Sequence, residues 1–369
     1  MTGSSSPAAC ALREDNVRLL TTRWTGLLIG LLLALVGCPG GSRGPSGDDD
    51  PTDDDDQADD DDALLCESPE PCPGDYEVWG DAAAAELSSC ESISGSLEIG
   101  GVSLLELPCL VSVGGDLEIS HNDGLADVDG LGALTSVGRD LHVVNNDGLV
   151  DLDGLSALVS VGRDVEVAHH SAVENLDGLS GLTSVAGNLT LDDNSALEEV
   201  SGLSNVTQVG GYLWLSENSV LTQIDGLSGL TAVGAGVHVR TNGSLTNVDG
   251  LSGLGSTGTG DLYLLANHSL TSLEGLSGIT QVGQDLTISD HALLPNLDGL
   301  SALTRIERGL YVERNGSLTN LGGLSSIEWV GSYIWISDNP SLCQSQVDGF
   351  LTACSCGDPV GTSGNDPSC

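Results

Sequence analysis

The chain has 369 residues, of which 54 are acidic and only 10 basic, and it contains no lysine. The formal net charge is −44 at neutral pH, which makes nucleic acid and anionic membrane surfaces poor binding partners. Hydrophobic residues make up 39% of the chain, enough for a substantial core. The composition is therefore that of an acidic globular protein or an acidic repeat protein.

The first predicted element is a secretion signal. Arg13, Arg18 and Arg23 precede an apolar run from Leu27 to Val36, which is too short to span a bilayer comfortably. The run ends on Leu35-Val36-Gly37-Cys38, which resembles the signal of bacterial lipoproteins. The resemblance implies that residues 1–37 are a signal peptide and that Cys38 is the lipidation site, acylated for instance with palmitate. Pro39 after the cysteine would then favour the outer membrane or cell surface. A single transmembrane anchor is the alternative.

An acidic tether follows, over residues 38–65. It consists of Gly, Ser, Pro and Asp and holds the runs Asp48 to Asp50, Asp53 to Asp56 and Asp59 to Asp62. Like charges repel and little apolar surface can be buried, so we expect this segment to be disordered. Calcium binding is an alternative, but the spacing lacks the glycine and the alternation of a calcium loop.

Cysteines mark both ends of the expected folded region. Four precede or open a central repeat and four follow it, which predicts disulfide-rich segments at 66–96 and 343–369. Zinc is the competing interpretation, but no paired C-x-x-C motifs are present. The eight cysteines are Cys66, Cys72, Cys90, Cys109, Cys343, Cys354, Cys356 and Cys369.

Internal repetition is the strongest signal in the sequence. The phrase apolar-x-apolar-x-x-Asn-x-x-Leu recurs between residues 97 and 342, first at an interval of 20 and then of 24 residues, with one of 25. We call each repeat a rung and count positions from its first apolar residue. These position-0 residues are Leu97, Leu117, Leu141, Val165, Leu189, Leu213, Val237, Leu262, Leu286, Leu310 and Ile334.

Each rung reads as one turn of a β-solenoid. Apolar residues fall at positions 0, 2, 8, 11, 14, 17 and 20, of which the first two have the period of a strand. Glycine at positions 13 and 21 interrupts any long helix, so we expect coil corners. A single rung cannot bury its apolar face alone, which predicts an all-β parallel stack of about 11 rungs.

Two polar positions recur with the same period. Position 5 is asparagine in most rungs and histidine in His170 and His291, and we expect a ladder of side chains bonded to one another and to the turn backbone, with Asn in left-handed φ. Both histidines are interpreted as ladder substitutes rather than metal ligands. The acidic residues at position 12 are expected to accept backbone N–H groups before a left-handed glycine, with a calcium column as the alternative. They are Asp129, Asp153, Asp177, Asp225, Asp249, Glu274 and Asp298.

The Leu-x-Ile strand, Asn turn and Gly-Leu corner resemble the receptor L domain, a leucine-rich right-handed β-helix of growth-factor receptors and microbial surface proteins. Ala82–Leu87, a short segment of helical composition behind a possible Asp81 N-cap, and the run from Cys90 to Ile99 are similar to that family's N-terminal cap. The resemblance implies a right-handed solenoid and a Cys72–Cys90 disulfide. A leucine-rich-repeat horseshoe is the alternative fold, and two fused domains meeting near residues 255–261 would also fit.

No arrangement typical of catalysis appears, so we expect no enzymatic activity and no cofactor or metal. The candidate ligand-binding residues instead lie at positions −1 and 1, whose side chains face outward from the strand. Glu118, Glu166, Glu313 and Arg240 would add polar contacts. The candidates are Tyr212, Trp214, Tyr263, Tyr311, Tyr333, Trp335, His142 and His238.

These features together predict a lipid-anchored cell-envelope protein. It would present a rigid solenoid as a recognition or adhesion module for an extracellular or periplasmic protein or glycan. The alternative is an inert spacer or envelope scaffold, in which the outward rings only steady the sheet. A polysaccharide-acting β-helix enzyme is the third, less favoured interpretation.

Overall fold

The computed structural model describes residue 66, residues 69–356 and residues 359–369. The predicted signal peptide, the predicted lipidation site Cys38 and the predicted tether up to residue 65 lie outside the described residues. The described part belongs to one compact unit, Asp59–Cys369, built mainly from parallel β-strands. Within these residues no helix is both long and apolar enough to cross a membrane.

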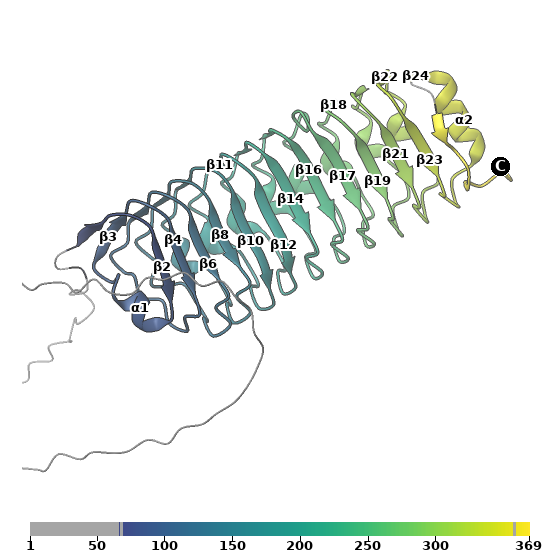
Figure 1. Ribbon diagram of the computed structural model, residues 1–369. Helices are drawn as coiled ribbons and strands as arrows, with labels where there is room; N and C mark the ends of the chain where they lie inside the picture. Colours follow the sequence, from purple (N-terminus) through teal and green to yellow (C-terminus); the bar gives the residue numbers. More distant parts are fainter. Residues whose placement is uncertain (1–65, 67–68, 357–358) are drawn as a thin grey trace, which may run out of the picture. The chain divides into compact units, whose positions relative to one another are not determined.

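The main sheet stacks strands from successive rungs in parallel (Figure 1). Position 0 of each strand pairs with position 0 of the next, as in Leu141 with Val165. The 24-residue repeat therefore fixes the register. Its strands are β2 (Tyr76–Trp79), β4 (Leu97–Gly100), β6 (Leu117–Ser120), β8 (Leu141–Val144), β10 (Val165–His170), β12 (Leu189–Asn194), β14 (Tyr212–Ser216), β16 (Gly236–Arg240), β17 (Asp261–Leu265), β19 (Leu286–Ser289), β21 (Leu310–Glu313), β23 (Ile334–Ser337) and β25 (Pro359–Gly361).

A second set of parallel strands, mostly two residues long, lies at positions 19 and 20 of most rungs, and no separate pattern in the sequence predicted it. It divides into two sheets, with the break at the 25-residue rung. The first holds β1 (Glu70–Cys72), β3 (Cys90–Ile93), β5 (Ser112–Val113), β7 (Ser136–Val137), β9 (Ser160–Val161), β11 (Ser184–Val185), β13 (Gln208–Val209) and β15 (Ala232–Val233). The second holds β18 (Gln281–Val282), β20 (Arg305–Ile306), β22 (Trp329–Val330) and β24 (Ser355–Cys356).

The main sheet runs unbroken past this point, since β16 pairs directly with β17. The extra residue is taken up in the corner between them, where Gly258 has φ +64° and the buried Thr257 hydroxyl donates to the Gly260 carbonyl at 2.9 Å. Both halves of the repeat array thus lie in one compact unit.

The corners at position 12 are single turns of 3-10 helix, where we expected coil. In Asp153–Leu155 the Asp153 carboxylate does not accept the capping bond; instead the backbone N–H of Asp153 donates to the Asp151 side chain at 3.1 Å. The expected left-handed glycine is wrong as well, because Gly154 has no positive φ. A Cβ there would overlap the carbonyl oxygen of Val128 in the preceding rung, so glycine is required by the close approach of neighbouring rungs. The corner turns are η2 (Asp153–Leu155), η3 (Asp177–Leu179), η4 (Ser201–Leu203), η5 (Asp225–Leu227), η6 (Asp249–Leu251), η7 (Glu274–Leu276), η8 (Asp298–Leu300) and η9 (Gly322–Leu324).

The apolar positions form one continuous core. In the rung that begins at Leu141, the side chains at positions 0, 2, 8, 11, 14 and 17 are all completely buried. Stacking thus removes from water the apolar surface that a single rung would expose.

The asparagine ladder is confirmed, but its bonds run mainly to the backbone. The Asn218 side chain accepts the Asn194 N–H at 3.0 Å and donates to the Leu191 carbonyl at 3.0 Å. His170 and His291 take the same place, and the ring of His291 contacts the Asn267 and Leu264 carbonyls at 3.1 Å. Burial lowers the pKa of His291 to about 4.

The left-handed residue of each turn is at position 4, not at the asparagine of position 5 as expected. Side chains of many types occupy it, including Glu217 with φ +60° and Ala266 with φ +55°. The asparagine must point into the ladder, so the preceding residue takes the turn's positive φ.

Before Leu97 lies the short helix α1 (Asp81–Ala85). Gly80 is its N-cap, so the Asp81 cap is wrong; the Asp81 carboxylate instead accepts the Ser103 and Leu104 N–H groups at 2.7 and 3.1 Å. Two disulfides, Cys66–Cys109 and Cys72–Cys90, tie this end to the first rungs. The pairing implied by the L-domain resemblance is present.

At the other end, α2 (Gln344–Ala353) covers the last rung, with Val347 and Phe350 buried (Figure 1). Disulfides join Cys343 to Cys369 and Cys354 to Cys356. With the two disulfides near β1, all eight predicted cysteines are bonded in pairs. Both ends of the core are thus closed by a helix and covalent links.

Candidate functional site

The predicted site residues lie on the outer face of the main sheet, which is turned toward the viewer in Figure 1. Because the strands are in register, residues at positions −1, 1 and 3 form three columns that run along the stack. Column 1 is continuous: Trp214 pairs with His238, and His238 pairs with Tyr263.

Four rings from three neighbouring strands gather in what we call the aromatic patch: Tyr212, Trp214, His238 and Tyr263. The His238 ring centroid lies 4.6 Å from that of Trp214, 4.7 Å from that of Tyr263 and 5.2 Å from that of Tyr212. All four side chains are half-buried. Burial lowers the pKa of His238, so the imidazole is neutral at neutral pH.

Arg240 lies beside the patch in column 3. Its guanidinium carbon stands 4.7 Å from the centroid of the Trp214 ring, a cation–π contact. Its Nε is buried without a hydrogen-bond partner, and so is the Nε2 of His238. The structure thus places a cation against the predicted rings.

A second Trp site repeats the arrangement near the last strand. The indole N–H of Trp335 donates to the Ser337 hydroxyl at 2.8 Å, and that hydroxyl lies 3.3 Å from the Glu313 carboxylate. In the aromatic patch, Trp214 donates to Ser216 at 2.7 Å, and Ser216 contacts Asp192. The Trp-x-Ser spacing was the available sequence signal, and our sequence analysis missed it.

Several of the predicted rings also cover glycines, either in a neighbouring strand or in the same rung. A Cβ on Gly236 would lie 2.8 Å from the Tyr212 ring, and one on Gly309 would lie 2.7 Å from the Tyr311 ring. The Trp335 ring lies over Gly361 in the same way. Such packing steadies a sheet, and it favours the spacer alternative for Tyr212, Tyr311 and Trp335. Tyr333, by contrast, is 50% exposed.

His142 is separated from the other candidates. It sits in an acidic stretch of column 1 formed by Glu77, Glu98, Glu118, His142 and Glu166, and its Nδ1 lies 2.7 Å from the Glu166 carboxylate. This hydrogen bond raises the pKa of His142 and lowers that of Glu166. The structure therefore does not bring His142 together with the aromatic patch.

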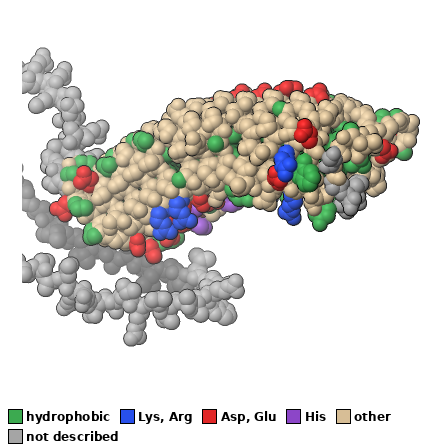
Figure 2. Space-filling view, turned by 90° about the horizontal axis from the view of Figure 1, so that it is seen from above, with side chains coloured by type: hydrophobic (Ala, Val, Ile, Leu, Met, Phe, Trp, Pro, Cys, Tyr) green, Lys and Arg blue, Asp and Glu red, His purple; other side chains and the backbone are tan. Residues whose placement is uncertain are grey.

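Column −1 is a polar ladder that sequence reasoning missed. Each carboxylate accepts the backbone N–H of the corresponding residue one rung later, as Asp140 does from Asp164 at 2.9 Å. Arginines flank this ladder, with Arg163 3.2 Å from Asp140 and Arg308 3.3 Å from Asp285. Figure 2 shows arginines at separate places along one side, each next to acidic side chains. The carboxylates of this column are structural, whereas Tyr212 at the same position belongs to the aromatic patch.

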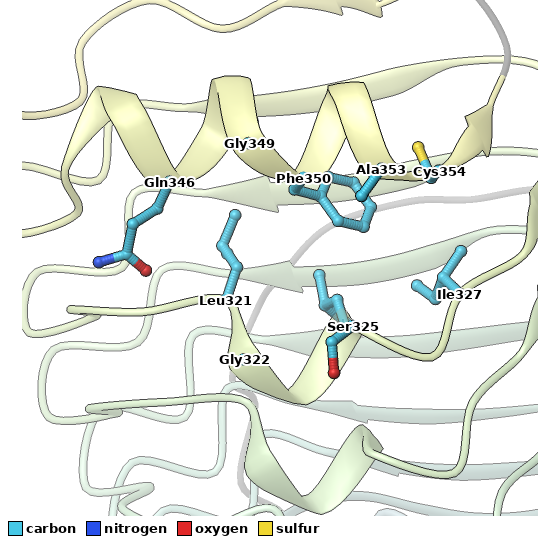
Figure 3. Close-up of a pocket in the computed structure, with 10 residues that line it drawn as sticks. Leu321, Gly322, Ser325, Ile327, Gln346, Gly349, Phe350, Ala353 and Cys354 are labelled. Carbon is cyan, nitrogen blue, oxygen red and sulfur yellow. The ribbon is translucent and has the colours of Figure 1, made fainter.

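The cavities found in the described residues lie away from the aromatic patch. One of about 320 Å³ separates α2 from the last corner, with Phe350 pointing toward Leu321 and Ser325 (Figure 3). Another of about 340 Å³ lies beside Leu104 and Pro108 near the first rungs. No residue of the aromatic patch lines these cavities, so the patch is suited to an extended ligand rather than to one enclosed in a pocket.

No group of three or more His, Cys, Asp or Glu side chains in the described residues could hold a metal ion. The carboxylates at position 12 crowd one another instead. Partial burial and repulsion from Asp127, Asp151 and Asp153 raise the pKa of Asp129. The geometry assigns no calcium ion to this column.

No protein-family model matches this sequence, and no curated protein matches it either. The resemblance to the receptor L domain therefore stays a prediction that rests on the residues quoted for it.

Proposed function

We propose that the protein is a cell-envelope lipoprotein that presents its β-stack as a non-catalytic binding module. The observation that carries this proposal is the aromatic patch, in which four rings of three strands are in contact on the outer face. Aromatic rings on a rigid sheet offer large contact area at little entropic cost. The ligand is an extracellular or periplasmic protein or glycan.

The same proposal includes the finer features of the fold. We take the stack to be a right-handed solenoid of 11 rungs, related to the receptor L domain and closed by the disulfide-bonded segments 66–96 and 343–369. The paired cysteines support an oxidising compartment.

Anchoring through Cys38 is tested by intact-mass analysis of the protein extracted from membranes. The proposal expects a chain that begins at an acylated Cys38 with eight oxidised cysteines. A chain that retains residues 1–37, or one with free thiols, would contradict the lipoprotein assignment and the compartment inferred from it.

The binding role is tested with Trp214→Ala and Trp335→Ala, measured as binding of the purified chain to whole cells and envelope extracts. Loss of binding in Trp214→Ala supports recognition by the aromatic patch. Trp329→Ala is the matched control, because Trp329 also has a stacked arginine but belongs to the second set of strands and is 42% exposed. Equal binding by all variants would favour the spacer.

An inert spacer or scaffold is the second candidate, because several rings cover glycines and could serve the sheet alone. A polysaccharide-cleaving activity is the third. It is tested by turnover on a panel of polysaccharides with and without calcium, for which we expect none.

A further inference from the structure

Arg240 differs from the other arginines of the described region. Each of the others has a carboxylate within ion-pair distance, while Arg240 has none and stacks on Trp214. In a chain with a net charge of −44, an arginine without an acidic partner is conspicuous. Its buried, unpartnered Nε is destabilising for the free protein.

No carboxylate of the described residues lies within ion-pair distance of Arg240, and the nearest acid of column 3, Asp192, is hydrogen-bonded to Ser216. The neighbours of Arg240 in column 3 are Ser216 and Leu265, and the neighbouring His238 is neutral at neutral pH. Exposed charges beyond about 8 Å are largely screened at physiological salt, so the acidity of the whole chain does not cancel this local cation. A planar guanidinium matches a carboxylate in a bidentate pair.

The rings beside Arg240 have the spacing of a sugar chain. Trp214 and Tyr263 lie two strands apart in one column, about 10 Å at ~4.8 Å per strand, which is close to the length of a disaccharide. Aromatic faces pack against the C–H faces of pyranose rings, and a chain laid along the stack would follow column 1.

We propose that β14, β16 and β17 bind a largely neutral glycan that carries an isolated carboxylate. Its pyranose rings stack on Trp214 and Tyr263, and the carboxylate pairs with Arg240. This inference rests on the proposed function, because it names the ligand class of the same face.

The ligand must carry few negative charges. Asp261 lies in column −1 beside His238, Asp192 contacts Ser216, and Glu313 lies farther along column 3. A polyuronate would place further carboxylates next to these acids, where like charges repel. A neutral chain with one carboxylate can pair that carboxylate with Arg240 and places no further negative charge beside these acids.

The test uses the full mature chain and titration calorimetry with four oligosaccharide probes. These are xylohexaose, the same chain with one glucuronic acid branch, the same chain with one sulfate, and hexagalacturonate. We expect the glucuronic acid branch to improve affinity about tenfold over xylohexaose, and hexagalacturonate to bind more weakly than the branched probe. Equal affinities for the neutral and branched probes, or tighter binding of the sulfated or polyuronate probe, would overturn the proposal.

Two arginine variants test whether Arg240 causes the preference for the probe with the glucuronic acid branch. Arg240→Gln should abolish the tenfold preference, so that the variant binds xylohexaose and the glucuronic acid probe with equal affinity. Arg305→Gln should keep the preference, because Arg305 stacks on Trp329 of the second set of strands and already pairs with Glu307. A preference that survives in Arg240→Gln, or one that is lost in Arg305→Gln, would refute the role of Arg240; circular dichroism checks that both variants are folded at the temperature of the titration.

Trp214→Ala separates this inference from the proposed function. If wild-type protein binds cells through Trp214 but binds none of the four probes, the glycan inference fails and the binding module stands. If neither cells nor probes are bound in a Trp214-dependent way, both fail.

Discussion

The two halves of the outer face are built on the same core but carry different chemistry. Up to β10, column 1 is acidic, with Glu98 paired with Glu118 across adjacent strands. From β14 onward it carries an aromatic or imidazole ring on every strand up to β23 except β19, where Thr287 follows Trp214, His238 and Tyr263. The inward residues at positions 0 and 2 are buried aliphatic side chains in both halves. The fold thus constrains the inner face and leaves the outer face free to differ.

The comparison predicts that core substitutions act alike in both halves. Gly178→Ala and Gly299→Ala should each destabilise the protein by about 3 kcal/mol, because the new Cβ overlaps a carbonyl oxygen of the preceding rung, that of Leu152 or Leu273. Thermal unfolding followed by circular dichroism measures the effect. Gly243→Ala is the control, since no heavy atom lies within 4 Å of its Cβ position. A loss confined to one half would show that the halves are not equivalent inside.

The asparagine ladder should give the next largest effect. Asn146→Ala removes the side-chain partner of the Asn122 N–H and of the Ile119 carbonyl. Asn315→Ala does the same to the His291 N–H and the Ile288 carbonyl. We expect about 2 kcal/mol of destabilisation from either variant. Chemical denaturation is the measurement, and values that differ strongly between the two would break the equivalence of the halves.

The two outward histidines should respond to pH in opposite directions. The hydrogen bond to Glu166 raises the pKa of His142 above its ordinary 6.5. The stability that this bond gives to the folded protein is therefore fully present below pH 6.5 and is lost as pH rises through the pKa of His142 in the folded state. Because the His142–Glu166 pair is half-exposed, it contributes about 0.5 to 1 kcal/mol to the free energy of unfolding. The pKa of His238 is lowered by burial, so its folded state loses stability as pH falls below 6.5.

Melting temperatures of His142→Gln and His238→Gln between about pH 5.5 and pH 8.5 check this. The deficit of His142→Gln relative to wild type should be larger at low pH than at high pH. For His238→Gln, which also loses ring contacts, the deficit should shrink as pH falls. Parallel profiles for the two variants would contradict the assigned environments.

The smallest effect is expected from the acidic stretch itself. Glu98 lies between Glu77 and Glu118, so Glu98→Gln should stabilise the protein by a few tenths of a kcal/mol at low salt. The gain should vanish at high ionic strength because screening removes the repulsion. A gain that persists in high salt would point to a cause other than charge.

The sequence was sufficient to predict the strands of the repeats in the main sheet, the core and the ladder, because each follows from a pattern repeated within every rung. His170 and His291 were correctly assigned because they replace asparagine at a fixed position. The corner glycines were assigned to the right place for the wrong reason. Gly154 is needed by contact with Val128 of the previous rung, and such contacts between rungs are invisible in one rung read alone.

Alternation along a strand was enough to place the candidate residues on the outer face. It could not show which of them meet, since that depends on neighbours 24 or 25 residues away. Aligning the rungs in register would have put His238 between Trp214 and Tyr263 and moved His142 into the acidic stretch. The stacking of Arg240 on Trp214 also depends on rotamers, which no sequence pattern specifies.

The 25-residue rung carries a practical consequence. The chain takes up one extra residue near Gly258 while β16 and β17 remain paired and the main sheet is unbroken. An additional residue in the chain is therefore tolerated at this corner of the second set of strands, away from the outer columns. An epitope or fluorescent label inserted at Gly255, which is exposed and has no heavy atom within 4 Å of its Cβ position, would report on the molecule without disturbing the face where a ligand is expected.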